Sequence, residues 1–349
     1  MKEADIRSAD LFDRFLELVH QDNERLLADK SGFVNVACPG CGSWKHQPSF
    51  DKGGFYYVVC LECDSLYLSP RPDRVPLAAY CREAEAVRFW STHFYKETAQ
   101  SRKKYIFKPR AVRVSELAES CCVTDNHVLA DVGAGYGMLL GEVAKLNQFK
   151  ELIAIEPVAE MASICKSEGF RVIEKSAEQL TADDSQVSIV AAYEVLEHVF
   201  DPAAFLSGCA RILLPGGLLQ FSTLTVSGFD IQTLWERSKN IYAPHHINLL
   251  SVRGIQCLIE RCGLDLVELT TPGRLDVDIV SNALQEDPTI SLPPFFVRLV
   301  VECDEKIRES FQEFLAAHRL SSHLQCVVRR PLTFDCEAPN PASSTDRCM

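Results

Sequence analysis

Four cysteines stand in two short knuckles with the spacing of a metal site. The segments Cys38-Pro-Gly-Cys41 and Cys60-Leu-Glu-Cys63 each place two thiols on one side of a tight turn. Zinc binds four thiolates in a tetrahedron, so two knuckles supply a complete ligand set. Because no coordination position stays open, the sequence predicts a structural Zn2+ ion that supplies folding energy to a small zinc ribbon. Two incidental cysteine pairs are the alternative.

A glycine-rich turn has the pattern of a nucleotide-binding loop. The segment Asp131-Val-Gly-Ala-Gly-Tyr-Gly137 follows an apolar, strand-like run and precedes a stretch with helical periodicity. Glycines at these positions let the backbone turn tightly and approach a ligand closely. The dinucleotide fingerprint G-x-G-x-x-G is not met, because Met138 and Leu140 stand where its third glycine would be. A hydride-transferring enzyme therefore loses its main support.

Acidic residues end the strands that follow this loop. Glu156 closes an apolar run about twenty residues beyond the loop, where a carboxylate can accept hydrogen bonds from both ribose hydroxyls. Glu178 follows the next strand and could accept from an adenine amino group, with a helix-capping role as the alternative. The fourth strand stops near Tyr193 and Glu194. These strand ends are predicted to line one binding site.

Together the segments resemble the class I S-adenosylmethionine-dependent methyltransferases, in the methyltransferase domain 23/11-like group. The resemblance covers residues 85–330 and depends on Tyr193-Glu-Val-Leu-Glu-His-Val199, followed by Asp201-Pro202 and Leu214-Pro-Gly-Gly-Leu218. It implies an α/β fold with a Rossmann-like sheet of seven strands in the order 3-2-1-4-5-7-6, the last strand being antiparallel. S-adenosyl-L-methionine is then the implied cofactor.

The resemblance also implies a role for each cofactor-binding residue. The amino-acid end of the cofactor would be held by Asp131, Gly133, Gly135 and Gly137. Glu156 would hold the ribose, and Glu178, Tyr193 and Glu194 would complete the site, the last two beside the methyl donor. His198 stands where a helix begins, so a structural hydrogen bond is expected of it.

A second group of candidate residues follows the fifth strand, in the segment Tyr242-Ala-Pro-His-His246. Neutral imidazole titrates near working pH and therefore suits a general base. The segment is similar to the Pro-x-His segment of sugar C-methyltransferases with an N-terminal zinc module. That similarity implies that His246 is the catalytic base, with Tyr242 beside it and His245 where such enzymes tend to have an acid. Alternatively, His246 caps the helix predicted from Ser251, with help from Asn248.

Two further segments mix charges with apolar residues. The helix-patterned stretch 89–104 ends in Arg102 to Lys104, which could meet the phosphate of a nucleotide sugar or form an ordinary solvated face. Asp276 and Asp278 could line a polar acceptor pocket or hold a turn. Both interpretations stay open for each segment.

The elements that must position these residues alternate between strands and helices. Strands that are apolar on both faces indicate a parallel sheet covered by helices on either side. Helical sequence is expected over 76–120, with an interruption near Lys108-Pro109, and again over 295–319. The predicted strands are 128–132, 152–155, 172–173, 187–192, 218–222, 264–269 and 324–328.

The chain divides into four predicted parts, and Ser69-Pro-Arg-Pro-Asp73 forms a stiff connection near one boundary. Apolar residues at helical spacing between 5 and 29 indicate an amphipathic helix. The tail is rich in Pro and Ser. The parts are an N-terminal amphipathic helix (1–30), the zinc ribbon (31–75), a methyltransferase domain (76–331) and a flexible tail (332–349).

Composition narrows the function classes. Apolar and charged fractions of 47% and 24% are those of a globular protein. No apolar run approaches the roughly 20 residues of a membrane span, and no leader pattern precedes the first helix, so a cytoplasmic protein without a membrane partner is expected. The formal charge of −12 disfavours nucleic acid as a partner. The oligomeric state is left open.

The sequence thus predicts a methyltransferase that acts on a small-molecule acceptor, a sugar or nucleotide-linked sugar being favoured, with a histidine as general base. Carbon, oxygen and nitrogen acceptors all stay open. One alternative is a methyltransferase or binding protein whose zinc ribbon docks RNA or a protein. Another is a fold that binds the cofactor without catalysis.

Overall fold

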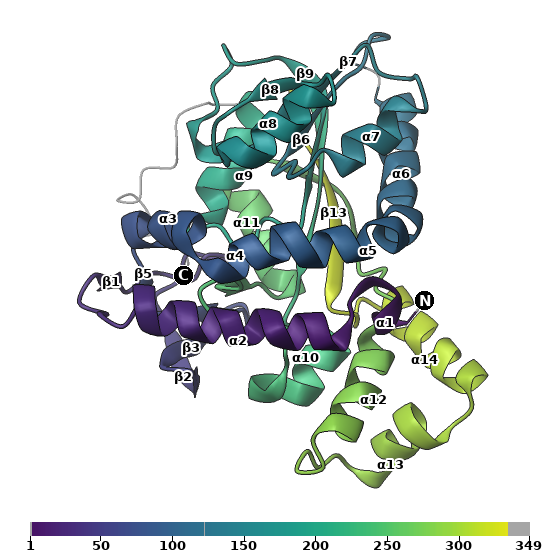
Figure 1. Ribbon diagram of the computed structural model, residues 1–349. Helices are drawn as coiled ribbons and strands as arrows, with labels where there is room; N and C mark the ends of the chain where they lie inside the picture. Colours follow the sequence, from purple (N-terminus) through teal and green to yellow (C-terminus); the bar gives the residue numbers. More distant parts are fainter. Residues whose placement is uncertain (1, 122, 334–349) are drawn as a thin grey trace, which may run out of the picture.

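Seven strands form the central sheet of the computed structural model, which describes residues 2–121 and 123–333 (Figure 1). When these seven strands are numbered 1 to 7 in chain order, they lie side by side in the order 3-2-1-4-5-7-6, as predicted. The last strand runs antiparallel to both of its neighbours, and the other pairs in the sheet are parallel. The strands are β6 (Val128–Val132), β7 (Glu151–Ile155), β8 (Arg171–Ile173), β9 (Val187–Tyr193), β10 (Leu213–Leu224), β12 (Asp265–Thr270) and β13 (His323–Arg329).

Helices cover both faces of this sheet because its strands are apolar on both. On one face, α6 (Lys108–Ser120) and α7 (Met138–Ala144) pack against alternate strand residues such as Leu129. On the other face, α9 (Pro202–Arg211) and α11 (Val252–Arg261) pack against the residues in between. The connection after β7 carries α8 (Ala159–Ser167), and the one after β8 carries the 3-10 turn η3 (Ala177–Gln179). The layers therefore present the carboxyl ends of four parallel strands along one edge.

The helical region before the sheet is broken more often than the sequence indicates. Two π-helical turns, 90–94 and 103–107, interrupt it, and Pro109 lies in the first turn of α6, where its missing N–H costs nothing. The interruption predicted near Lys108-Pro109 is thus present as a helix boundary. The other helices here are α3 (Arg74–Glu83), α4 (Glu85–Phe89) and α5 (Tyr95–Arg102).

The N-terminal stretch forms α1 (Glu3–Ile6) and α2 (Ala9–Leu26), and α2 lies beside α4 in Figure 1. The apolar stripe of α2 is buried, with Phe12 and Phe15 almost inaccessible to solvent. This stripe is therefore packing surface within the molecule.

Four strands form a second sheet around the cysteines. β2 (His46–Lys52), β3 (Phe55–Cys60) and β4 (Leu66–Leu68) are consecutive, but the fourth strand, β11 (Asn248–Leu249), comes from the region after the fifth strand of the central sheet. β1 (Phe33–Val34) pairs with β5 (Arg71–Pro72). We call residues 33–72 the cysteine module. Its sheet is completed by a segment that lies far away in the sequence.

The C-terminal helices differ from prediction in one respect. The single helix expected over 295–319 is wrong, because Cys303 is extended and Asp304 starts a new helix by accepting a hydrogen bond from the Ile307 amide. The observed helices are α10 (Phe229–Leu234), α12 (Asp276–Glu286), α13 (Pro294–Val297) and α14 (Glu305–Ala317). Residues 334–349 of the predicted tail lie outside the described residues. Within the described ranges, no helix combines the length and apolar character of a membrane span.

Candidate functional site

The glycine loop joins β6 to α7 at the carboxyl edge of the sheet. Gly133 and Gly135 have φ angles of +75° and +54°, in the left-handed region that favours glycine. A Cβ at Gly133 would lie 2.7 Å from a methyl of Val195, whereas a Cβ at Gly135 would point into open space. Hydrogen bonding of the Gly133 amide to the Ile155 carbonyl, at 2.9 Å, ties the loop to β7. The loop therefore leaves room for a ligand at Gly135.

Two buried acids lie under this loop. Glu156 accepts hydrogen bonds from the amides of Gly135 and Val158, each at 2.9 Å, so it holds the loop from the end of β7. Burial raises the pKa of Glu156, and it raises the pKa of Asp131 to about 7 against the opposing charge of Arg110. A cationic ligand at this position would relieve the cost of ionising Asp131.

Glu194 follows β9 in a strained conformation, with φ of +57° for a residue that is not glycine. Arg110 and Ser222 donate to its Oε1 at 2.7 and 2.6 Å. Burial raises its pKa, but His323 and Arg110 outweigh burial and hold the pKa at about 2. The Arg110 guanidinium also lies 4.4 Å from the ring centroid of Tyr193. Glu194 is thus an anion held in place at the edge of the sheet.

Sequence reasoning missed Arg110 and His323. Arg110 lies on α6, 84 residues before Glu194, and His323 begins β13. No local motif marks either residue, because both reach Glu194 through the packing of α6 and the antiparallel strand on the sheet.

Glu178 lies half-buried in η3, beyond the end of β8. Ser176 and Gln179 make the capping box of this turn, and Glu178 is the acidic residue of its first turn, so a role at the helix end stays open. An adenine contact stays a prediction.

His246 lies buried beside the end of β9. Its Nδ1 is 2.6 Å from the carbonyl oxygen of Asn240, which can only accept, so Nδ1 carries the proton and Nε2 is free to accept one. Nε2 lies 3.3 Å from the Tyr242 hydroxyl. Burial, with the neighbouring His198 adding to it, lowers the pKa of His246 well below its usual value. The ring is therefore neutral, with Nε2 as its unprotonated nitrogen.

The helix-capping alternative for His246 is wrong. Ser251 caps α11 with its own hydroxyl, which accepts from the Gly254 amide at 2.8 Å. Asn248 instead donates to the carbonyls of Leu196 and Val199.

His245 has different surroundings. Its ring packs against Phe15 and Tyr80, at centroid distances of 5.5 and 5.4 Å, and burial lowers its pKa to about 3. Its backbone carbonyl accepts from His198 Nδ1 at 3.0 Å, which is the structural hydrogen bond expected of His198. Both imidazoles thus contact Tyr242 and His198, but the His245 ring also packs against the aromatic rings of Phe15 and Tyr80.

A three-residue group at this edge has the composition of a metal site. One ligand atom each from Glu197, His198 and His246 lies within 4.8 Å of the others. Burial and the neighbouring Glu194 raise the pKa of Glu197 well above its usual value, and Glu197 accepts from the Thr223 hydroxyl at 2.8 Å.

The charged segments left open by the sequence are engaged within the protein. Asp276 is buried and accepts from the Ser321 hydroxyl and the Ser322 amide, while Asp278 accepts from the Glu3 amide. Lys103 pairs with Glu142 at 3.4 Å. These contacts favour the structural interpretation of both segments.

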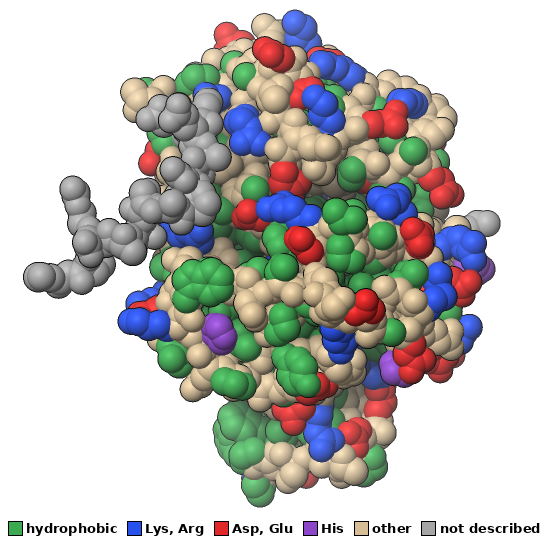
Figure 2. Space-filling model, turned by 90° about the vertical axis from the view of Figure 1, so that its left-hand side faces the viewer, with side chains coloured by type: hydrophobic (Ala, Val, Ile, Leu, Met, Phe, Trp, Pro, Cys, Tyr) green, Lys and Arg blue, Asp and Glu red, His purple; other side chains and the backbone are tan. Residues whose placement is uncertain are grey.

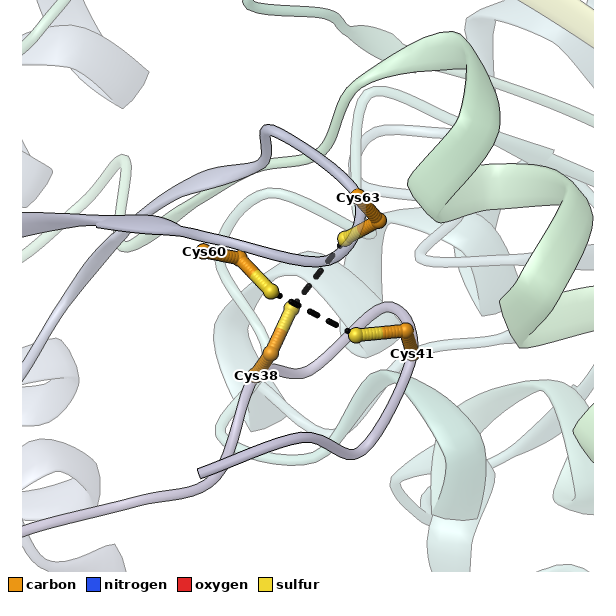
Figure 3. Close-up of side chains that lie close together, drawn as sticks. All are labelled: Cys38, Cys41, Cys60 and Cys63. Carbon is orange, nitrogen blue, oxygen red and sulfur yellow. Dashed lines mark hydrogen bonds between the residues drawn. The ribbon is translucent and has the colours of Figure 1, made fainter. Parts of the chain in front are cut away.

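The four knuckle cysteines turn their sulfurs toward a common centre (Figure 3). Sulfur atoms of Cys38 and Cys63 are 3.5 Å apart, and those of Cys41 and Cys60 are 3.4 Å apart. Four thiolates at about 2.3 Å from one zinc ion would be separated by about 3.8 Å, close to these distances. The donor set therefore fits a tetrahedral zinc ion.

Comparison with known proteins agrees with the fold. Residues 130–221 match the model of a methyltransferase domain. A ubiquinone biosynthesis O-methyltransferase of Cereibacter sphaeroides is 31% identical over 152 residues, which cover 41% of this chain and 61% of that protein. One from Xanthomonas oryzae pv. oryzae is 37% identical over 103 residues, covering 27% and 41%. The chain thus matches less than two thirds of the length of these curated relatives.

Among solved structures, the plantazolicin methyltransferase in complex with SAH is similar at a TM-score of 0.47 and 13% identity. The similarity covers 73% of this chain and 94% of that one.

Proposed function

We propose, on the premise that residues 130–221 form a class I methyltransferase domain, that the protein transfers a methyl group from S-adenosyl-L-methionine to a small molecule. The observation that carries the proposal is the neutral, buried imidazole of His246 beside Glu194 and Glu197, at the edge of the sheet where the glycine loop also lies. Ligands of open α/β sheets bind at this edge.

The residues around the loop fit the cofactor. Its sulfonium supplies an already activated methyl group. Asp131 and the glycines 133, 135 and 137 would hold its amino-acid end, because a buried acid suits an ammonium and the open space at Gly135 leaves room for the ligand. Glu156 would accept from the ribose, Glu178 would lie by the adenine, and Tyr193 and Glu194 would border the methyl group.

His246 would take the proton that the acceptor loses, at Nε2. The Asn240 carbonyl keeps the proton of the free base on Nδ1, so that Nε2 presents its lone pair. Once Nε2 is protonated, the nearby Glu194 anion stabilises the imidazolium. Tyr242 lies beside Nε2, and His245 packs the segment against α2. A base of this kind suits a hydroxyl or a carbon acid, and both groups occur in the sugars and nucleotide-linked sugars that we favour as acceptors.

The cysteine module would hold structural zinc in this scheme. Docking of RNA is the less supported role, because the basic residues of this region are engaged within the protein. Lys45 pairs with Glu62, Lys52 donates to the Ser238 carbonyl, and Arg74 pairs with Asp201. Arg71 is fully buried. On the face shown in Figure 2, positive and negative side chains of the described residues are interspersed. Salt-dependent RNA binding at micromolar protein would reverse this ranking.

A methyl-release screen tests the proposal. Production of S-adenosylhomocysteine is measured with panels of nucleotide sugars, free sugars and phenols. With the acceptor so found, the His246→Ala variant should lose turnover by about a thousandfold or more, within the usual range for a general base, while still binding S-adenosylhomocysteine. Retained turnover would remove His246 from the mechanism, and binding without release for every acceptor would favour a non-catalytic cofactor-binding fold.

A further inference from the structure

The backbone that carries His246 is held from the cysteine module. The Tyr57 hydroxyl, on the buried face of β3, donates to the carbonyl of His246 at 2.9 Å. The Leu68 amide, at the end of β4, donates to the carbonyl of Ile247 at 3.0 Å. Two consecutive carbonyls, beginning with that of His246, are therefore satisfied by the module.

The next residues pair with the module as a strand. In β11, Asn248 lies opposite Tyr67, and Leu249 lies opposite Leu66. Arg71, which is buried, donates to the side-chain oxygen of Asn248 at 3.0 Å. On the opposite side, the segment is held by the turn that follows β9, because the Glu197 carbonyl accepts from the amides at 247 and 248. The segment thus joins the cysteine module to the turn after β9.

The second knuckle holds the far end of the same segment. The Ser251 amide donates to the Ser65 hydroxyl at 3.0 Å, and the Ser251 hydroxyl donates to the Cys63 carbonyl. Ser65 Oγ also lies 3.2 Å from Cys63 Sγ. Gly254 lets α11 approach this turn, since a Cβ there would lie 2.1 Å from Ser65 Oγ. A short series of contacts therefore runs from a cysteine of the cluster to the loop of His246.

We propose that the four-cysteine cluster, through Tyr57 and Ser65, is the template that positions the His246 loop (residues 246–251) for catalysis. The physical reason is that the cysteine end of this sheet packs only a small buried cluster around Val58 and Tyr67, so a bound metal adds folding free energy to the module and thereby stabilises its hydrogen-bond partners for the loop. Tyr57 and Ser65 are positioning residues, since they act on His246 through the backbone. This inference rests on the proposed function of His246.

The glycine loop provides the internal comparison, because it is held by β7. Full-length protein loaded with zinc is compared with protein stripped by a chelator and with stripped protein reloaded with zinc. Amide exchange over 246–251 and over 131–137, S-adenosylhomocysteine affinity, and the ring nitrogen shifts of His246 are measured. Metal loss should speed exchange at 246–251 about a hundredfold or more and abolish the Nδ1–H tautomer signature, and zinc should restore both. S-adenosylhomocysteine affinity should change less than about threefold.

If removal of zinc unfolds the whole cysteine module, single substitutions in the metal-loaded protein still test the positioning role. Tyr57→Phe removes one buried hydrogen bond and should speed exchange at 246–248 by about five- to tenfold. Tyr56→Phe, at the exposed neighbouring position, is the matched control and should have no effect. Ser65→Ala removes the hydrogen bond from the Ser251 amide and should likewise speed amide exchange at residue 251.

The outcomes separate the two proposals. Unchanged exchange at 246–251 in both the stripped protein and Tyr57→Phe would overturn the positioning role. Absence of S-adenosylhomocysteine binding by the loaded protein would instead overturn the proposed function.

Discussion

The two halves of the candidate site are built in different ways. In the cofactor half, Asp131, Glu156 and Glu194 lie at the carboxyl ends of neighbouring parallel strands, and the glycine loop is hydrogen-bonded to β7 and Glu156. In the acceptor half, the Tyr57 hydroxyl binds the backbone carbonyl of His246, and the Asn240 carbonyl binds its ring. Arg7, near the N-terminus, donates to the side-chain oxygen of Asn240 at 2.8 Å. The first half is formed along a single edge of the sheet. The second half forms only when three segments that are distant in the sequence, those of Arg7, Tyr57 and His246, come together.

The halves also differ in charge. Burial raises the pKa of Asp131, so the cofactor half contains a carboxyl group whose ionised form a bound cation would stabilise. Burial lowers the pKa of His245 and of His246, so the acceptor half holds neutral imidazoles. A cationic ligand fits the first environment and a proton donor fits the second, as a methyl transfer with a base requires.

The largest expected effect is the loss of the metal, which should destabilise the cysteine module but not the cofactor half. Cys60→Ser should remove the metal and destabilise the cysteine module by on the order of 5 kcal/mol or more, because the binding free energy of structural zinc is folding free energy. Zinc content, expected at one ion per chain before substitution, and limited proteolysis of residues 33–72 check this.

The cofactor half should be nearly unaffected by Cys60→Ser, keeping its S-adenosylhomocysteine affinity within about threefold. Cys81→Ser, at an exposed cysteine, is the control. Substoichiometric zinc in the unaltered protein together with a folded module in Cys60→Ser would contradict the zinc assignment.

The second-largest expected effect is a loss of cofactor affinity that involves the cofactor half alone. Gly133→Ala puts a side chain at φ of +75° and a Cβ 2.7 Å from Val195, so the loop must move. Calorimetry should show S-adenosylhomocysteine affinity weakened by about a hundredfold, equivalent to about 3 kcal/mol of strain. Gly141→Ala is matched to it, since that helical glycine has open space around it and should tolerate the change. Equal affinities in the two variants would show that the loop does not bind the cofactor.

The smallest effect concerns charge. The pKa of Asp131 is raised to about 7, so it is ionised above and protonated below that pH. Because the ammonium of the ligand favours the ionised form, S-adenosylhomocysteine affinity should fall about tenfold from pH 8 to pH 6.

Asp131→Asn should flatten this pH dependence, whereas Glu174→Gln, at an exposed acid, should keep it. An unaltered slope in Asp131→Asn would assign the titration to another group.

The fold was largely predictable because its signals are local. Strand runs, turn glycines and the strand-end motifs lie within single segments. The sheet order and the antiparallel last strand, which the family resemblance implies, are confirmed. The helix over 295–319 was predicted as one because its apolar spacing continues across the break. The capping side chain of Asp304 ends that continuity, and periodicity does not reveal it.

The acceptor half was less accessible to sequence reasoning. Adjacent imidazoles at 245 and 246 look equivalent in the sequence. Only the structure shows that the His245 ring packs against Phe15 of α2, whereas His246 binds the Asn240 carbonyl through Nδ1. The cap alternative for His246 failed because Ser251 provides its own cap. Arg110 and His323 could not have been found, since neither lies in a motif.

The sequence alone therefore determined which chemical groups the protein possesses: a glycine turn with acids at successive strand ends, and four thiols in two knuckles. These follow from backbone conformation and ligand number, which depend on neighbours along the chain. Tertiary structure decided which groups meet. It placed Arg110 against Glu194, gave the cysteine sheet a fourth strand from residues 248–249, and joined that sheet to the loop of His246. Such contacts depend on how layers pack, and packing joins residues that no local pattern relates.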